Sequence, residues 1–300
     1  MSNPLLRFED GKISIGGKDV LASSANLSIA PTLEVERVYG DYDPSIVGAR
    51  TEFVNFAPTQ NLKGQLDISF YISADTFAVD GNPNTIDRMF DIADGMSEAP
   101  IHNNVVGRYS FDNMYLKSFG FDMKPFGIIQ ANASYDIYGS VTRVIDRRFQ
   151  KSAVDFAHGL KSFGNIVASA GGQDQFEIAG LKYNIIVGRK VYNHIRGNEH
   201  TSLNTTPHGA VPARVTVENI EKEMTLEANE FVDNLNAYGD QQYGTSPESL
   251  NNTKIEAFLL SLQGERIARF SVSGKIQSES MRIQEGQHAM GSITVKEIVK

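Results

Sequence analysis

Apolar and polar residues alternate with a period of two through a long segment near the middle of the chain, 115–137. This pattern is typical of strands that bury one face. The alternation breaks at 124–127, where Pro125 and Gly127 occupy favoured turn positions, so we predict a long antiparallel hairpin. On the apolar face we expect Tyr115, Lys117, Phe119, Phe121 and Met123 from the first strand, and Ile129, Ala131, Ala133, Tyr135 and Ile137 from the second.

A hairpin of the same kind is predicted near the C-terminus, in 270–295. Apolar and polar positions again alternate on either side of an expected turn at 285–286. The expected apolar face carries Phe270, Val272, Ile276, Ala289, Gly291, Ile293 and Val295. Two such hairpins in one chain indicate that a single module is built twice.

The residues before the first hairpin predict four more strands, at 13–20, 25–29, 33–39 and 62–72. The segment 40–58 has no sustained period, so we predict a long loop there. Its apolar content indicates that the loop docks on another surface. Asn84 is a suitable cap for a helix that stops at Gly95.

The second half repeats this order of strand, long loop, strand, helix and hairpin. Its expected elements are strands at 181–192, 215–228 and 255–262, a loop at 193–212 and a short helix at 231–238. An amphipathic helix in 143–163 and a linker at 168–173 precede them. The predicted fold is therefore mainly β with a few short helices (α+β): two tandem antiparallel β-sandwich or barrel modules at 1–145 and 173–300, joined by a helical segment and linker at 146–172.

The composition narrows the possible functions. The 300 residues suffice for two domains, and the chain contains no cysteine, which excludes disulfides and thiolate chemistry. The net charge of −8 argues against tight binding to nucleic acid. The first residues have no secretory pattern, and no apolar run is long enough to span a bilayer, so we expect synthesis in the cytoplasm and no membrane partner.

No motif in the sequence predicts an active site. His194, His200 and His208 share one expected loop, but their spacing matches no common zinc pattern. Acidic pairs such as Glu34 with Glu36 and Asp41 with Asp43 would share a strand face, yet such pairs are more often solvated surface than an acid and base couple. We expect no enzymatic activity, no metal and no cofactor.

In the order and spacing of its elements, the chain resembles bacteriophage tail tube proteins. The residues that carry the resemblance are the opening 10–41, the long loop before the strand at Leu62, the helix after that strand, and the ribbon ending at 130–141. In that family a β-barrel or sandwich module forms rings of six modules, the rings stack into a tube, and DNA passes through the lumen. The resemblance implies a structural virion protein of the phage tail, made in the host cytoplasm, in which three chains of two modules form a ring with pseudo-six-fold symmetry.

The resemblance also implies roles for particular segments. The long loops at 41–58 and 194–212 would make contacts between rings, with candidate residues Asp41, Asp43, Ile46, Val47, Arg50, Phe53, Phe56, His194, Arg196, Glu199 and His200. The hairpins at 115–137 and 270–295 would line the lumen, with candidate residues Lys117, Asp122, Lys124, Gln130, Asn132, Asp136, Lys275, Glu279 and Arg282. The implied partners are further copies of the chain, the sheath, terminator, baseplate and tape measure proteins, and DNA in transient, non-specific passage during ejection.

Two alternatives stay open from the sequence. The chain could be another virion component, such as a tail terminator, neck, baseplate or capsid decoration protein. It could instead be a carbohydrate-binding or carbohydrate-cleaving β protein, which the acidic pairs and asparagine-rich loops would suit. The absence of tryptophan, a favoured surface for stacking sugars, weakens this second alternative.

Overall fold

The computed structural model describes a mainly β protein. It covers residues 13–20, 22–30, 33–39, 52–58, 63–72, 98–124, 128–139, 141–143, 166–170, 173–175, 178–192, 212, 214–229, 253–260, 266–283, 285 and 290–299. All strand pairs in this part of the chain are antiparallel, and none of these residues is helical. The expected helices at 84–95 and 231–238 lie outside the described residues, and so does the helix expected at 143–163 except for Arg143, which ends a strand.

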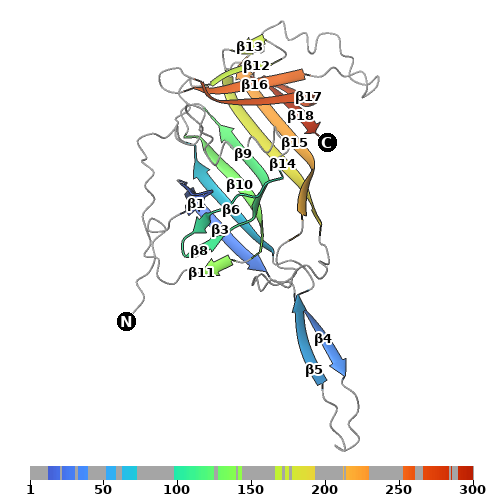
Figure 1. Ribbon diagram of the computed structural model, residues 1–300. Coiled ribbons are helices and arrows are strands. Elements are labelled where there is room, and N and C mark those ends of the chain that lie inside the picture. Colours follow the sequence, from blue (N-terminus) through green and yellow to red (C-terminus); the bar gives the residue numbers. More distant parts are fainter. Residues whose placement is uncertain are drawn as a thin grey trace, which may run out of the picture.

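One continuous sheet of eleven strands organises the molecule (Figure 1). Its strand order is β13-β12-β16-β17-β18-β15-β14-β9-β10-β6-β3. The first half of the chain supplies β3 (Ala22–Ala30), β6 (Lys63–Tyr71), β9 (Met114–Met123) and β10 (Gln130–Tyr138). The second half supplies β12 (Ile166–Ala170), β13 (Gln173–Gln175), β14 (Ile178–Tyr192), β15 (Arg214–Asn229), β16 (Thr253–Leu260), β17 (Arg266–Arg282) and β18 (Met290–Val299).

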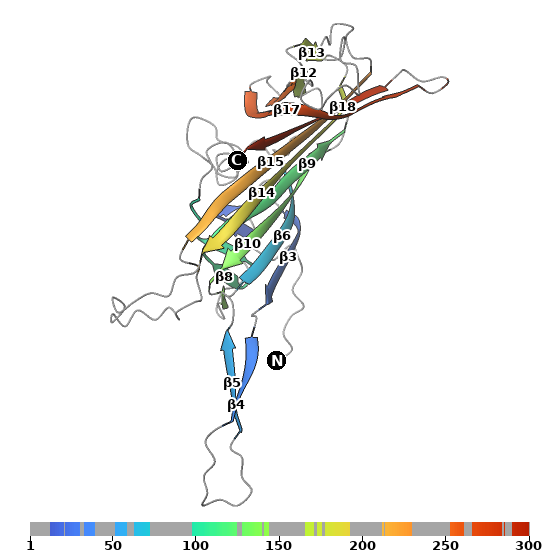
Figure 2. The same cartoon turned by 90° about the vertical axis from the view of Figure 1, so that its right-hand side faces the viewer.

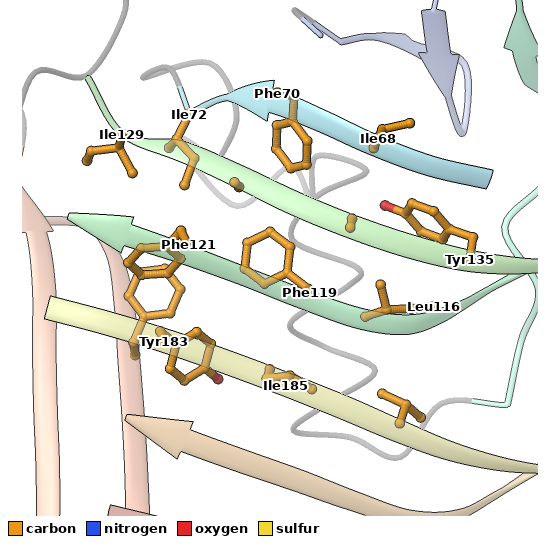
Figure 3. Close-up of a cluster of buried hydrophobic side chains, with 14 of the residues drawn as sticks. Ile68, Phe70, Ile72, Leu116, Phe119, Phe121, Ile129, Tyr135, Tyr183 and Ile185 are labelled. Carbon is orange, nitrogen blue, oxygen red and sulfur yellow. The ribbon is translucent and has the colours of Figure 1, made fainter. Parts of the chain in front are cut away.

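A smaller sheet packs on one face of the large one. Its order is β11-β8-β7-β1-β2, formed by β1 (Ile13–Ile15), β2 (Lys18–Asp19), β7 (Asn104–Val106), β8 (Tyr109–Phe111) and β11 (Val141–Arg143). Ile13, Ile15 and Phe111 of the small sheet share one hydrophobic cluster with Leu66 and Phe70 of the large sheet. Figure 3 shows the large-sheet side of this core, in which Phe70 of β6, Phe119 of β9 and Tyr183 of β14 project from the same face of the sheet.

The predicted alternation is confirmed in most of the first half. Leu66, Ile68 and Phe70 of β6 are buried, and so are the four apolar residues from Ala131 to Ile137 of β10. The prediction for β9 was wrong at its start, because Leu116 is fully buried while Lys117 is exposed. The pairing with β10 skips Lys117, which forms a β-bulge, and a bulge shifts the alternation by one residue.

The two halves have the same strand order and the same register. In both, the order across the sheet is first, second, fourth, third strand: β3-β6-β10-β9 and β14-β15-β18-β17. Equivalent residues in the two halves are separated by a nearly constant number of positions. The separation is 156 between β3 and β14, 158 between β6 and β15, and 160 both between β9 and β17 and between β10 and β18. For example, Ala22 pairs with Phe70 as Ile178 pairs with Ala228.

The bulges also coincide in the two halves. The pairing of β3 with β6 skips Ser23, and that of β14 with β15 skips Ala179, 156 residues later. The pairing of β9 with β10 skips Lys117, and that of β17 with β18 skips Gln277, 160 residues later. Because a bulge depends on local geometry, two shared bulges show that the same supersecondary unit occurs twice.

The small hairpin that opens each half repeats too. In β1 and β2, Ser14 pairs with Asp19 around Gly16 and Gly17, whose positive φ angles of 59° and 82° suit a two-residue turn. In β12 and β13, Ser169 pairs with Asp174 in the same register. The prediction of a linker at 168–173 was therefore wrong, because β12 ends at Ala170, just before the glycine pair, and β13 begins at Gln173, just after it.

The predicted loop at 40–58 is a strand in its last part. Residues of β5 (Glu52–Pro58) pair with β4 (Leu33–Tyr39) in a separate two-stranded hairpin. This hairpin projects away from the large sheet, beyond the ends of β3 and β6 (Figure 2). We call β4 and β5 together the arm.

The expectation of two separate sandwich or barrel modules needs correction in one respect. The strands of both halves belong to one sheet, since β9 of the first half pairs directly with β14 of the second. In the second half, β17 is long enough to serve two layers: its residues 266–274 pair with β16, and 275–282 pair with β18. In the first half, two separate strands take these two positions: β8 pairs with β7 in the small sheet, and β9 pairs with β10 in the large sheet.

The core predicts that the two halves unfold together. Phe121 is buried, and its ring lies 5.6 Å from that of Tyr183 and 4.8 Å from that of Phe270, both in the second half. We expect Phe121→Ala to lower the free energy of unfolding by about 3–5 kcal/mol in a single urea transition. Ile128, which is 53% exposed, is the control, since Ile128→Ala removes much less buried surface and is expected to cost under about 1 kcal/mol. Two separate transitions in the Phe121 variant would contradict a shared core.

Candidate assembly site

The junction between the two halves is a pair of antiparallel strands. Six consecutive pairs join β9 to β14, from Met123 with Leu181 to Ser118 with Ile186. The third strand of the first unit therefore meets the first strand of the second unit. This arrangement is head to tail, because the two units present different edges to each other.

Side chains on the core face of this junction are fully buried. Met123, Phe119 and Ile185 are each 1% exposed. The Phe121 and Tyr183 rings contact each other across the junction, and Phe270 packs against both at 4.8 and 5.0 Å (Figure 3 shows the first two). Aromatic pairs at such distances contribute packing energy beyond the area they bury. The junction is thus as well packed as the interior of either unit.

A second contact crosses the junction beside the main core. Arg189 of β14 donates from Nε to the carbonyl of Leu116 at 3.0 Å, and its guanidinium lies 5.2 Å from the centre of the Tyr115 ring. Tyr115 and Tyr138 form a small buried cluster with Val215. Burial lowers the pKa of Arg189, and the two tyrosines and Asp136 partly offset this effect. The first unit thus contacts β14 through a cation–π interaction as well as through the backbone pairing of β9 with β14.

The face of the large sheet opposite the core is polar. In the first unit it carries mainly serine, asparagine and glutamine side chains, which form a network: Ser134 donates to Asp67 at 2.6 Å, Gln65 to Asp67 at 3.0 Å, and Gln130 to Ser23 at 2.7 Å. A shallow groove of about 530 Å³ runs along this face over β3, β6, β10, β9 and β14. Small neutral side chains of this kind offer few strong charges to a ligand.

The same face carries more charge in the second unit. Glu221, Glu223 and Glu227 alternate with buried residues along β15. Glu221 accepts from Lys296 at 2.8 Å, and this contact raises the pKa of Lys296. Thr225 and Thr294 hydrogen-bond at 2.8 Å between them. We call this whole surface, in both units, the polar face.

Most of the residues predicted to line a lumen lie at positions of the polar face. Asp122 and Gln130 are paired and exposed, Asn132 is exposed, and Asp136 is partly buried with Lys63 Nζ at 3.4 Å. Lys275 and Arg282 lie at polar-face positions of β17, Arg282 at the position that matches Asp122, and both are exposed. Two others differ: exposed Lys117 is the bulge residue, and exposed Lys124 follows the end of β9. Glu279 is paired with the buried Ile293, so its strand position belongs to the core face.

The residues predicted to make contacts between rings are largely outside the described chain. Phe53 and Phe56 lie in β5, paired with Val38 and Val35 of the arm. The others, Asp41, Asp43, Ile46, Val47, Arg50, His194, Arg196, Glu199 and His200, lie outside the described residues. The two predicted loops do occupy equivalent places, since 40–51 connects β4 to β5 and 193–213 connects β14 to β15.

The described residues hold no group of three histidine or acidic side chains that could bind a metal ion. His102 is exposed, 4.0 Å from Asp112. The histidines of the 193–212 segment and the acidic pairs at 34–36 and 41–43 fall where side chains are not described. Within the same described part, no helix is long and apolar enough to cross a membrane.

Comparison with known proteins gives no relative from which to infer a function. No protein-family model matches the sequence, and no curated protein matches it. The function must therefore be argued from the repeated unit, its junction and its edges.

Sequence reasoning found the hairpins of this site but not the junction itself. The pairing of β9 with β14 joins residues about sixty positions apart, and period-two alternation does not show which strand lies beside which. A signal was present in the glycine pairs at 16–17 and 171–172, which stand between Ser and Asp at the same spacing in both halves. Aligning the halves on these turns would have found the repeat.

The buried tyrosine beside the junction predicts alkaline destabilisation. Burial and the neighbouring Asp136 raise the pKa of Tyr138 to about 12, against about 10 in the unfolded chain. Its neutral form stabilises the fold below pH 10, and this contribution is lost as the pH rises from 10 to 12, because the unfolded state releases its proton first. We expect the stability difference between wild type and Tyr138→Phe to shift by at most about 2–3 kcal/mol over this range, measured by urea unfolding at pH 8, 10 and 11.5. A constant difference across the three pH values would contradict the assignment.

Proposed function

We propose that this chain is a structural virion protein, the subunit of a bacteriophage tail tube, and that it acts by assembly rather than by catalysis. The observation that carries the proposal is the repeat joined head to tail: one chain already contains two units linked edge to edge. A head-to-tail contact can repeat without limit, so that it closes into a ring if the rotation per unit divides a full turn. A rotation of about sixty degrees would close after six units, which is three chains.

The two faces of the sheet support a tubular wall. The core face is covered by the small sheet and by β16, whereas the polar face carries no covering strand among the described residues. Turned inward, the polar face would line a lumen with serine, asparagine and glutamate side chains. The carboxylates of this face, two of which pair with Lys63 and Lys296, disfavour tight binding of phosphates, so DNA would slide past it during ejection.

The arm supports stacking of the rings. A two-stranded hairpin that extends beyond the large sheet cannot bury its own faces, and in a tube it would reach the ring above or below (Figure 2). In this proposal the virion tail is the location, further copies of the chain are the main partner, and sheath, terminator, baseplate and tape measure proteins are the other partners. A terminator, neck or baseplate ring is the nearest alternative, and it differs in forming one ring per particle.

The direct test is electron microscopy of the purified protein with native mass spectrometry. We expect rings with a central hole that have the mass of three chains, and stacked tubes at high concentration. Single rings that never stack would favour the terminator, neck or baseplate alternative. A monodisperse monomer at high concentration would contradict the proposal.

Shortening the arm separates stacking from ring formation. Arg37 and Val54 are directly paired, so residues 38–53 can be replaced by an Asn-Gly turn without changing the register of the remaining hairpin. We expect this variant to form rings but no tubes in electron micrographs. Circular dichroism and thermal unfolding serve as controls: a variant that unfolds would show that the arm belongs to the core, and a variant that still forms tubes would remove its role in stacking.

A further inference from the structure

We propose that β17 of one copy pairs with β3 of a second copy, in the register in which β9 pairs with β14 inside the chain. The inference deepens the proposed function by naming the two edges that meet, and it relies on that function only for the closed ring. β9 and β17 are equivalent third strands, and β14 and β3 are equivalent first strands. The chain therefore contains one junction of a third strand with a first strand, β9 with β14. It also contains the two strands, β17 and β3, that could form a second such junction between copies.

The two edges are available in the described part of the chain. β3 is the last strand of the large sheet and pairs with β6 alone. Residues 275–282 of β17 pair with β18 on one side, and no described strand pairs with their other side. Exposed strand edges promote pairing with another chain, and proteins that stay monomeric usually block them.

The register of the new junction follows from the equivalent positions. Each pair of the internal junction predicts a pair between copies. The β17 residue is found by adding 160 to the β9 residue number, and the β3 residue by subtracting 156 from the β14 residue number. The pair of Met123 with Leu181 becomes Ile283 with Ala25. The pair of Gly120 with Asn184 becomes Ser280 with Ser28. Both predicted pairs keep the faces of the originals, the first on the core side and the second on the polar face.

Exposed isoleucines mark the positions that this junction would bury. Ile283 is 76% exposed, while its counterpart Met123 is 1% exposed. Ile29 is 39% exposed, while its counterpart Ile185 is 1% exposed. The internal residues pair directly with the other unit, Met123 with Leu181 and Ile185 with Phe119. The same pairing with a second copy would bury the two isoleucines.

A third exposed isoleucine fits the same scheme. Ile298 is 56% exposed, and its counterpart Tyr138 is 6% exposed in the cluster that crosses the internal junction. Three exposed isoleucines therefore lie where the repeat predicts contact with a neighbour. The partner that fits these edges is a second copy of this chain, because only the same unit carries the matching strand, bulges and register.

Paired cysteines test the register directly, because the chain has no cysteine of its own. We expect the double variant Ser28→Cys with Ser280→Cys to form disulfides between copies on mild oxidation, seen as dimers and trimers on non-reducing gels. Side chains of directly opposite residues in antiparallel strands lie close to disulfide distance. The off-register control, Ser28→Cys with Ser278→Cys, moves one thiol about 6.8 Å along the strand, and its cross-linked fraction is expected to be at least ~10-fold lower.

An internal pair provides the positive control. Ser118 and Ile186 face each other across the internal junction, so Ser118→Cys with Ile186→Cys is expected to form a disulfide within the chain and no ladder. One outcome would contradict the edge pairing alone: the control forms its disulfide and microscopy shows rings, but Ser28→Cys with Ser280→Cys cross-links no more than the off-register pair. The proposed edges would then be wrong, and the proposal of a tail tube would still stand. If the ladder forms and no ring or tube is found, the edge pairing holds and the tube function fails.

A second variant checks the edge without cysteines. Ile283→Lys is expected to reduce the fraction of assembled protein at least ~10-fold in sedimentation velocity, because a lysine would be buried opposite Ala25. Ile128 is the matched control: it is 53% exposed, two residues before β10, which is an interior strand of the sheet, and Ile128→Lys is expected to assemble as wild type does. Equal assembly of the two variants would overturn the proposal.

Discussion

The pairing of β9 with β14 is the interaction on which the rest of the molecule depends. It joins two copies of one unit into a single sheet, and it places Phe121, Tyr183 and Phe270 in one aromatic cluster that neither unit could form alone. A sheet built by joining units edge to edge always ends in two more edges. The internal junction thus accounts for the shared core and leaves the two strand edges that the proposed assembly would use.

The shared bulges show how strictly the unit is repeated. A bulge moves every following side chain to the other face, so a strand with a misplaced bulge would turn its apolar residues toward solvent. Lys117 and Gln277 stand at the same register position, as do Ser23 and Ala179, although the residues themselves differ. Geometry has been kept where residue identity has not, which is the expected result when the strands must join in a fixed register.

The sequence predicted local features well and distant pairings poorly. The strands around Leu66 and Tyr135 were found because alternation reports the burial of one face. Lys117 was assigned to the wrong face because a bulge leaves no mark in a period-two pattern. Residues 168–173 were taken for a linker because composition alone does not show that strands β12 and β13 flank the glycine pair. Residues 52–58 were taken for loop because their partner strand, β4, lies across a long connection.

The candidate site shows the same division. The polar positions of the two long hairpins could be predicted, since they alternate with the core. The edges that the proposed assembly uses could not be predicted, because an edge is defined by the absence of a neighbour in the folded sheet. Ile29 and Ile283 look like ordinary apolar strand residues in the sequence. They stand out only when the fold leaves them exposed while their counterparts Ile185 and Met123 are buried.

Hydrogen–deuterium exchange of the dispersed and the assembled protein would test the central claim most directly, because it reports which backbone amides gain hydrogen-bond partners. We expect assembly to slow exchange in peptides from β3 and from residues 275–283, to the level expected for β9 and β14 in the dispersed chain. Protection that appears elsewhere while these two edges keep exchanging fast would contradict the claim that one junction serves both inside and between the chains.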